Sequence, residues 1–340
     1  MNNDRIQEIL DLMEEARLDY FLISDPQSIA YCTGYYNDPH ERMFVFMISK
    51  HGNHTLFMND LFYLEHDLDV NIVWHKDGQD AIQTIVDEMH FPGRIGIDKN
   101  WASHFLLDLM KKLPDAKYIN ASPCVDLVRM KKDLQEQVLM IESSKINDAV
   151  MEEIIPFIQE GVTEKQLAKK LDELFFNHHS TCYGAIVAFG KNAADPHHEN
   201  DDTPLRKGDC VLIDMGCVYK GYCSDMTRTF FYEGILEEEI KVYEIVKKAN
   251  EAAEAMIKPG VKLSDIDKCA RKVISDEGYG KYFTHRLGHF IGRDVHEYGD
   301  VSSVNEMEVE EGMIFSIEPG IYLEGNFGVR VEDLVMVTKD

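Results

Sequence analysis

The sequence has few basic residues, no closely spaced cysteine pair and no long apolar run. Its 35 Lys and Arg residues face 61 Asp and Glu residues, which gives a formal net charge of −26. This charge argues against nucleic acid and anionic membrane surfaces as partners. The seven cysteines show no CxxC spacing, so we expect small buried side chains rather than disulfides or a thiolate zinc site.

No apolar run reaches the length of a membrane span, and the polar N-terminus does not predict a signal peptide. We therefore expect a cytoplasmic protein that does not associate with membranes.

The chain is long enough for two domains with separate cores. Residues 1–125 alternate strand patterns, such as 20–23, 43–48 and 94–97, with helical ones, which predicts an α/β domain. Residues 126–340 mix long helical patterns near 131–155 and 237–257 with short apolar strands, which predicts an α+β domain. Thr163 and Ser264 each begin a sequence that is typical of a helix capping box.

Two aspartates flank a predicted turn in the second domain. Asp214 ends an apolar run that predicts a buried strand, and Asp225 precedes a second β-prone run. A hairpin about Gly221 would place them roughly opposite each other, with Cβ atoms about 5 Å apart. That separation suits carboxylates that clamp a pair of metal ions. Taken alone, two aspartates near a turn are also common in ordinary loops.

Three histidines, at positions 285, 289 and 296, lie within twelve residues that also contain Gly288 and Gly292. The glycines argue against a continuous helix, and histidines grouped in this way more often mark a site than a lone histidine does. Further along, Glu318 and Glu332 lie in or beside apolar strands. Because an unpaired buried carboxylate is unfavourable, each of these glutamates requires a cation or a donor.

Five of these residues form one candidate ligand set: Asp214, Asp225, His289, Glu318 and Glu332. Four carboxylates and one imidazole suit two divalent metals with bridging carboxylates, and the four negative charges balance the four positive ones. Since paired metals generate a nucleophile from water at neutral pH, the set predicts a hydrolase.

The order of these motifs resembles that of the pita-bread metallopeptidases of family M24, which include methionine aminopeptidase, aminopeptidase P, prolidase and the metal-free creatinase. The motifs lie within about residues 180–337 and are Asp214-Met-Gly, Ser224-Asp-Met-Thr-Arg-Thr229, Gly288-His-Phe-Ile-Gly292, Ile317-Glu-Pro-Gly-Ile-Tyr322 and Gly328-Val-Arg-Val-Glu-Asp333. Tyr31-Cys-Thr-Gly-Tyr35 resembles the smaller domain of the proline-specific branch. The resemblance implies a creatinase-type N-terminal α/β domain and a pita-bread catalytic domain of the α+β class.

The resemblance also implies a chemical role for each residue. A hydroxide bridging two metals would attack an Xaa-Pro carbonyl, with Asp225 and Glu332 as bridging ligands. Asp214 would complete one metal site, and His289 with Glu318 the other. Glu318 would also shuttle the proton, and His296 would hydrogen-bond the carbonyl oxygen.

The remaining expected site residues lie around the substrate. His197 matches a pocket histidine of the family and His285 one near the proline ring. Phe290 or Tyr322 could form an apolar wall, although core packing explains either residue slightly better. The family favours manganese, with cobalt, iron or zinc as alternatives, and its members are commonly homodimers.

The chain departs from the family pattern in its basic residues and around His289. Phe290 stands where the family often has glycine, and Leu287 where it often has threonine. The stretch 297–317 contains no Lys or Arg, although prolidase-like relatives use a basic residue near there for the dipeptide carboxylate. This leaves Arg293 or Arg330 as substitutes.

Two Xaa-Pro activities therefore remain open: a dipeptidase (prolidase) and an aminopeptidase P acting on longer proline-containing peptides. A repurposed lyase or hydrolase of non-peptides, or a plain binding protein, agrees less well with the complete ligand set.

Overall fold

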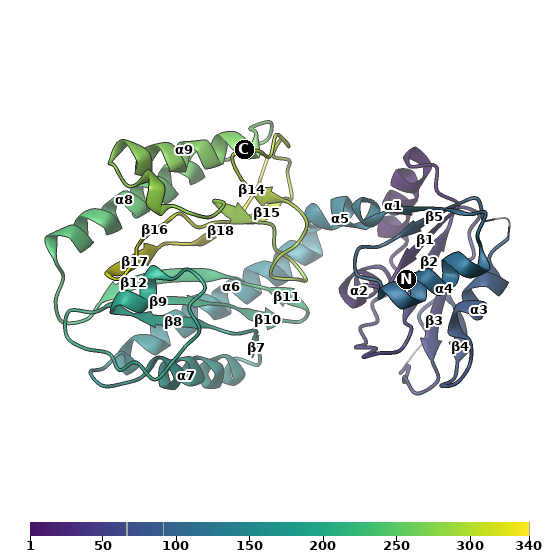
Figure 1. The fold of residues 1–340 in the computed structure, drawn as a ribbon, viewed down its shortest axis with the longest axis horizontal. Helices are drawn as coiled ribbons and strands as arrows, with labels where there is room; N and C mark the ends of the chain where they lie inside the picture. Colours follow the sequence, from purple (N-terminus) through teal and green to yellow (C-terminus); the bar gives the residue numbers. More distant parts are fainter. Residues whose placement is uncertain (66, 91, 340) are drawn as a thin grey trace. The chain divides into compact units, whose positions relative to one another are not determined.

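The computed structural model describes residues 1–65, 67–90 and 92–339, and the chain forms two compact units, Met1–Arg129 and Met130–Asp340 (Figure 1). The division falls inside helix α5 (Ser122–Met130), which also contains the sequence-predicted boundary at 125/126. Among the described residues, no helix combines the length and the apolar composition needed to cross a bilayer.

The N-terminal unit is built on one mixed six-stranded sheet in the order β4-β3-β2-β1-β5-β6. Its strands are β1 (Tyr20–Ile23), β2 (Val45–Ser49), β3 (Thr55–Asn59), β4 (Asn71–His75), β5 (Arg94–Ile97) and β6 (Lys117–Asn120). Its helices are α1 (Asn3–Glu15), α2 (Pro26–Thr33), α3 (Ala81–Glu88) and α4 (Ser103–Lys112). Alternate strand residues face two separate cores, with Phe21 in one and Leu22 in the other, because successive side chains point to opposite faces of a sheet.

The C-terminal unit places helices on both sides of a set of short antiparallel strands (Figure 1). Helices α6 (Leu134–Ile154) and α7 (Glu164–Asn177) pack together, as do α8 (Glu237–Glu254) and α9 (Leu263–Asp276). The strands of the first half are β7 (Thr181–Cys182), β8 (Ile186–Phe189), β9 (Cys210–Met215), β10 (Cys217–Tyr219), β11 (Tyr222–Cys223) and β12 (Met226–Phe231). Those of the second half are β13 (Gly288–His289), β14 (Asp300–Val301), β15 (Ile314–Ile317), β16 (Gly320–Leu323), β17 (Phe327–Arg330) and β18 (Asp333–Met336).

The predicted register of the aspartate hairpin is wrong by two residues. Strand β9 pairs with β12 so that Asp214 lies opposite Thr227 rather than Asp225. The intervening residues form a separate tight hairpin of β10 and β11, whose two turn residues, Lys220 and Gly221, have φ angles of 49° and 82°. Such a two-residue turn closes its own short ladder and belongs to a different sheet.

One of the two predicted helix starts is confirmed. Thr163 caps α7 with the reciprocal hydrogen bonds of a capping box. The prediction at Ser264 is wrong, because α9 begins at Leu263 and Asp267 lies inside it. Asp267 is buried and accepts hydrogen bonds from the Arg271 side chain and from the backbone N–H of Leu287.

Gly288 permits a close approach between two segments of the second half. A Cβ at this position would lie 1.8 Å from the carbonyl oxygen of Ser316 in β15. Next to it, the backbone N–H of His289 donates to the Ser316 hydroxyl (3.0 Å), and the N–H of Glu318 donates to the carbonyl of Leu287 (2.8 Å). This approach brings His289 beside Glu318.

Gly288→Ala should destabilise the protein by about 3 kcal/mol or more, since the added methyl group meets rigid backbone rather than a movable side chain. Gly234→Ala is the matched control, because its Cβ would meet nothing nearer than 3.5 Å. We expect it to change the free energy of unfolding by less than about 1 kcal/mol. Chemical denaturation of both variants measures the difference, and equal stabilities would contradict the close-packing argument.

Candidate active site

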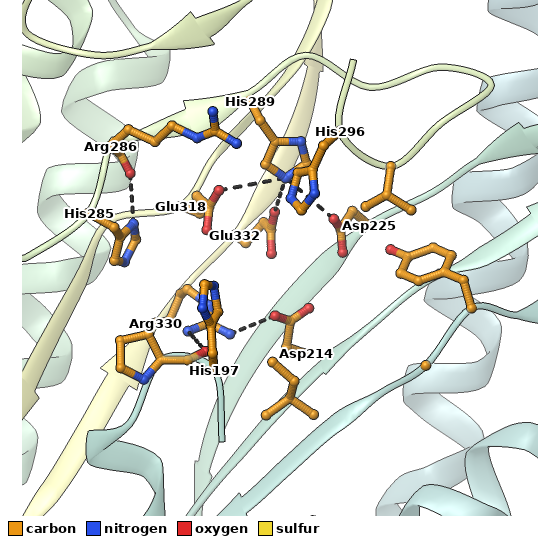
Figure 2. Close-up of a pocket in the computed structure, with 15 residues that line it drawn as sticks. His197, Asp214, Asp225, His285, Arg286, His289, His296, Glu318, Arg330 and Glu332 are labelled. Atoms are coloured by element: carbon orange, nitrogen blue, oxygen red, sulfur yellow. Dashed lines mark hydrogen bonds and ion pairs between the residues drawn. The ribbon is translucent and has the colours of Figure 1, made fainter. Parts of the chain in front are cut away.

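Fifteen residues line a cavity of about 540 Å³ in the C-terminal unit (Figure 2). They are Tyr183, Gly184, Ile186, Pro196, His197, Asp214, Asp225, His285, Arg286, His289, Val295, His296, Glu318, Arg330 and Glu332. The lining therefore brings together the five candidate metal ligands and also His197, His285, His296 and Arg330.

Two of the expected pocket residues lie behind the lining. Phe290 is fully buried and packs against Phe315, with ring centroids 5.3 Å apart. Tyr322 is also buried, and its hydroxyl contacts lining residues rather than open space. The side chains that provide apolar surface to the cavity are Ile186, Pro196 and Val295.

The imidazole of His289 faces three carboxylates. Its Nε2 lies 3.6 Å from an oxygen of Asp225, 3.6 Å from one of Glu318 and 3.9 Å from one of Glu332 (Figure 2). Its Nδ1 points to the carbonyl of Phe290 at 3.3 Å, and because a carbonyl can only accept, Nδ1 carries the proton. This tautomer leaves the Nε2 lone pair available to a metal.

A cation fits this cluster. Glu332 is buried; one of its oxygens accepts a hydrogen bond from the Thr227 hydroxyl at 2.7 Å, and the other has no hydrogen-bond partner among the described residues. The pKa of Glu332 is raised well above its usual range by burial and then by the charges of Asp225, Glu318 and Asp214. Ligand atoms of Asp225, His289 and Glu332 lie within 4.8 Å of one another, so one divalent ion could bind all three.

Asp214 lies at the other end of the cluster, against Arg330. The Arg330 guanidinium donates to its carboxylate at 2.6 Å, and also to the Thr227 and Tyr322 hydroxyls, each at 3.0 Å. Burial raises the pKa of Asp214, and Arg330 only partly offsets this effect. Arg330 is therefore committed to the protein's own acceptors, while the second oxygen of Asp214 remains available to a metal.

His285 is held as a neutral acceptor. Its Nδ1 donates to the carbonyl of Arg286 at 2.7 Å, so its Nε2 accepts the hydroxyl proton of Tyr322 at 2.8 Å. Burial lowers the pKa of His285 to about 4, helped by the charges of Arg330 and Arg271. The ring therefore presents a fixed, uncharged face to the cavity.

His296 lies across the cluster from Asp214, with its ring centroid 4.3 Å from that of His289. Removal from bulk water lowers its pKa to about 4, and the charges of His289 and Arg286 add to this effect. A neutral imidazole in this position can donate a hydrogen bond to a substrate without repelling nearby cations.

Tyr183 is a lining residue that the sequence reasoning missed. Its hydroxyl donates to the carbonyl of Ser224 at 2.8 Å, directly before Asp225. Burial, and then the charges of Asp225 and Asp214, raise its pKa well above the usual range, so it remains protonated. A Cβ at Gly216 would lie 1.9 Å from this hydroxyl. The Tyr183-Gly184 pair between two short strands was the only local signal for it.

A buried carboxylate outside the cavity lining anchors the segment that carries His197. Glu164, fully buried at the start of α7, accepts from the backbone N–H groups of Phe189 (2.9 Å) and Asp201 (3.0 Å). It also accepts from the side chains of Asn192 (2.9 Å) and His198 (2.7 Å). Four donors satisfy this carboxylate and fix both ends of the segment, which leaves the exposed His197 on the cavity rim.

The fold and the cluster together define a class: a metal-dependent hydrolase with an α+β catalytic unit. The chain belongs to metallopeptidase family M24, whose family model matches residues 138–339. Residues 5–131 match the Creatinase/Prolidase N-terminal domain. The expected pita-bread fold and the creatinase-type N-terminal domain are thereby confirmed.

Relatives cover nearly the whole chain. An uncharacterized peptidase of Staphylococcus aureus (strain bovine RF122 / ET3-1) is 34% identical over 345 residues, which cover 99% of this chain and 97% of the relative. A dipeptidase structure from Pyrococcus horikoshii OT3 is 36% identical, with a TM-score of 0.91 and coverage of 98% and 94% of the two chains. A prolidase structure from Thermococcus sibiricus is 32% identical, with a TM-score of 0.92 and coverage of 99% and 95%.

In the metal-free protein, the raised pKa of Glu318 should make the free energy of unfolding depend on pH. Burial raises that pKa from the ordinary 4.5 to about 7, so the folded state binds a proton that the unfolded chain releases. The resulting stabilisation of the folded state is fully present below pH 4.5 and is lost as the pH rises through 7. From pH 5.5 to pH 8 the wild type should lose this stabilisation, whereas Glu318→Gln should not. The free energy of unfolding of Glu318→Gln should therefore rise by about 2 kcal/mol relative to that of the wild type.

Denaturation of chelator-stripped proteins at the two pH values measures this gain. Contributions from His285 and His296 are common to both proteins and cancel in the difference. Glu324→Gln, at an exposed position in the turn between β16 and β17, should show no such pH dependence. A difference between wild type and Glu318→Gln that does not change with pH would contradict the raised pKa.

Proposed function

We propose that this chain is an Xaa-Pro dipeptidase that hydrolyses the bond preceding a C-terminal proline. The observation that carries the proposal is the group of four carboxylates and His289 in a cavity that also holds the neutral His285 and His296. A volume of about 540 Å³ is within the range of small-ligand sites. The likeness to a dipeptidase and a prolidase supports the same substrate class.

Two divalent ions are the proposed cofactors, held by Asp214, Asp225, His289, Glu318 and Glu332. When bound, such ions lower the pKa of water and polarise a carbonyl group. Carboxylate-rich ligation suits manganese first, with cobalt, iron or zinc as alternatives set by supply. We also propose a homodimer that works in the cytoplasm.

Glu318 is the proposed proton carrier. Its carboxylate lies in the cavity wall, where the Ser316 hydroxyl donates to one oxygen at 3.2 Å and the other oxygen is left for the reaction. Because its carboxylate would lie beside the attacking water, Glu318 can accept a proton from that water and return it to the leaving nitrogen.

His296 and His285 are the proposed contacts to the two sides of the scissile bond. His296 would donate to the carbonyl oxygen as negative charge develops there. His285, fixed by Tyr322, would face the proline ring together with the apolar Ile186, Pro196 and Val295, and His197 would contact the substrate from the rim. An Xaa-Pro bond has no N–H donor, and none of these proposed contacts requires one.

Aminopeptidase P is the alternative function. It would use the same five ligands, and it differs only in accepting residues beyond the proline. The absence of Lys and Arg from residues 297–317 favours this alternative, because no cation from that stretch can bind a dipeptide carboxylate.

Hydrolysis of Ala-Pro, Ala-Pro-Ala and Ala-Ala by chelator-stripped protein, with and without manganese, tests the proposal. We expect manganese-dependent cleavage of Ala-Pro, slow cleavage of the tripeptide and none of Ala-Ala. Preference for the tripeptide would establish aminopeptidase P. Failure to cleave any peptide while metals are bound would overturn the peptidase proposal.

His296→Ala should lower kcat by roughly 10²- to 10³-fold, the usual effect of removing one donor to a developing oxyanion. Because His296 is not a proposed metal ligand, metal content and KM should change little. His51→Ala, on an exposed turn of the N-terminal unit, is the matched control. Loss of bound metal, or a change confined to KM, would contradict the assigned role.

A further inference from the structure

The ring of His296 is not held by any hydrogen bond of its own. Its side chain forms no hydrogen bond or ion pair within the described part of the chain. Figure 2 shows it beside His289, and the two rings meet edge-on at an interplanar angle of 76°. The direction in which His296 points therefore depends on the backbone that carries it.

That backbone belongs to a short loop, residues 292–297, which a buried carboxylate closes. The side chain of Glu297 is only 5% exposed, and one of its oxygens accepts a hydrogen bond from the backbone N–H of Arg293 at 2.9 Å. The backbone N–H of Glu297 donates to the carbonyl of Phe290 at 2.8 Å. A Cβ on Gly292 would lie 2.7 Å from both carboxylate oxygens, so the loop wraps closely around this group. Glu297 thus joins the two ends of the loop.

The second oxygen of this carboxylate is held by a buried cation. The Lys132 ammonium donates to it at 3.0 Å, and the Lys132 side chain is only 1% exposed. The backbone of Lys132 is fixed in turn, because its N–H donates to the carbonyl of Gly312 and its carbonyl accepts from the Gln137 side chain, each at 2.8 Å. Lys132 directly precedes Asp133, the N-cap of helix α6. The cation is therefore presented to the loop from a rigid base.

The beginning of the loop is attached to the strand that leads to Asp225. The backbone N–H of Cys223, in β11, donates to the carbonyl of Gly292 at 2.7 Å. The Arg293 guanidinium lies over the ring of Tyr222, with its central carbon 5.4 Å from the ring centroid. These contacts set the loop relative to Asp225, one of the proposed metal ligands, while the carboxylate–ammonium pair holds its other end.

A buried ion pair contributes little to stability on balance, because apolar side chains of similar volume often stabilise a protein as well or better. What this pair adds is direction, since charge-assisted hydrogen bonds fix a carboxylate in a defined geometry. Geometry matters here, because a displacement of about 1 Å at a reacting group can lower a rate by about 100-fold. Glu297 does not line the cavity, so any effect on the reaction passes through the residue beside it, His296.

We propose that Glu297 is a positioning residue: paired with Lys132, it fixes the 292–297 loop so that His296 donates its hydrogen bond to the scissile carbonyl. The inference rests on the proposed function and assigns the origin of the orientation of His296. Both ring nitrogens of His296 stay available to substrate and solvent, while the neighbouring residue supplies the rigidity.

Kinetics of the manganese-loaded protein with Ala-Pro test this role. Glu297→Gln and Lys132→Met should each lower kcat by roughly 10- to 100-fold and leave KM and manganese content within about two-fold. When His296→Ala is already present, Glu297→Gln should lower kcat no further than about two-fold, because it acts through the missing ring. Glu310→Gln is the control, since it removes the exposed partner of the neighbouring Lys131 and should leave kcat unchanged.

A double variant separates positioning from stability. Each single substitution leaves one buried charge unpaired and should lower the denaturation midpoint, whereas Lys132→Met/Glu297→Gln removes both charges and should recover most of it. The double variant should nevertheless keep kcat at least about 10-fold below that of the wild type, because the directional contact is still missing. Recovery of kcat together with the midpoint would overturn the inference, as would an undiminished effect of Glu297→Gln in the His296→Ala protein.

Hydrogen exchange of the manganese-loaded protein, followed by mass spectrometry, tests the Glu297–Lys132 contact without any cleavage. The backbone N–H groups of Gly292, Arg293 and Glu297 all donate hydrogen bonds and should be protected. Lys132→Met/Glu297→Gln should speed their exchange by about 10-fold or more and leave that of strand β9 unchanged. Unchanged exchange in the loop would also overturn the inference. Faster exchange in a protein that cleaves no peptide would keep the contact as the support of the loop and remove only the peptidase function.

Discussion

The mutual repulsion of four carboxylates in one cavity is the constraint on which the site depends. Each carboxylate accepts a hydrogen bond from the protein through one of its two oxygens. Arg330 pairs with Asp214, the N–H of Met226 donates to Asp225 at 3.1 Å, and hydroxyl groups donate to Glu318 and Glu332. The oxygens that remain face the interior, where burial raises the pKa of several of these groups. The fold thus positions the carboxylates but leaves most of their charge to be neutralised by cations.

The hydrogen bonds around the cluster extend this arrangement outward. Tyr322 joins Arg330 to His285: its hydroxyl accepts from Arg330 and donates to the ring, in agreement with the tautomer set by the carbonyl of Arg286. Asp267 and Glu164, both buried near the N-termini of helices, fix the segments that carry His285 and His197. The helices of the unit therefore serve the site by anchoring loops rather than by supplying ligands.

The sequence predicted the candidate ligands better than their surroundings. Glu318 and Glu332 could be named because a carboxylate in an apolar strand is a local conflict that needs a partner. Register and side-chain direction depend on distant contacts, so the opposition of the aspartates was predicted two residues out. For the same reason the sequence named Arg293 and Arg330 as candidate basic residues but missed Arg286, although Arg286 lines the cavity and Arg293 does not. The metal-ligand roles themselves remain predictions.

The separation of the ligands along the chain has a consequence for biosynthesis. Asp214 and Glu332 are 118 residues apart (332 minus 214). At about 5–20 residues per second, a ribosome needs about 6–24 seconds to add that stretch. Throughout this interval the nascent chain lacks Glu332, and Asp225, His289 and Glu318 are added only in the course of it. The proposed set of five ligands is therefore complete only when nearly the whole chain has been made.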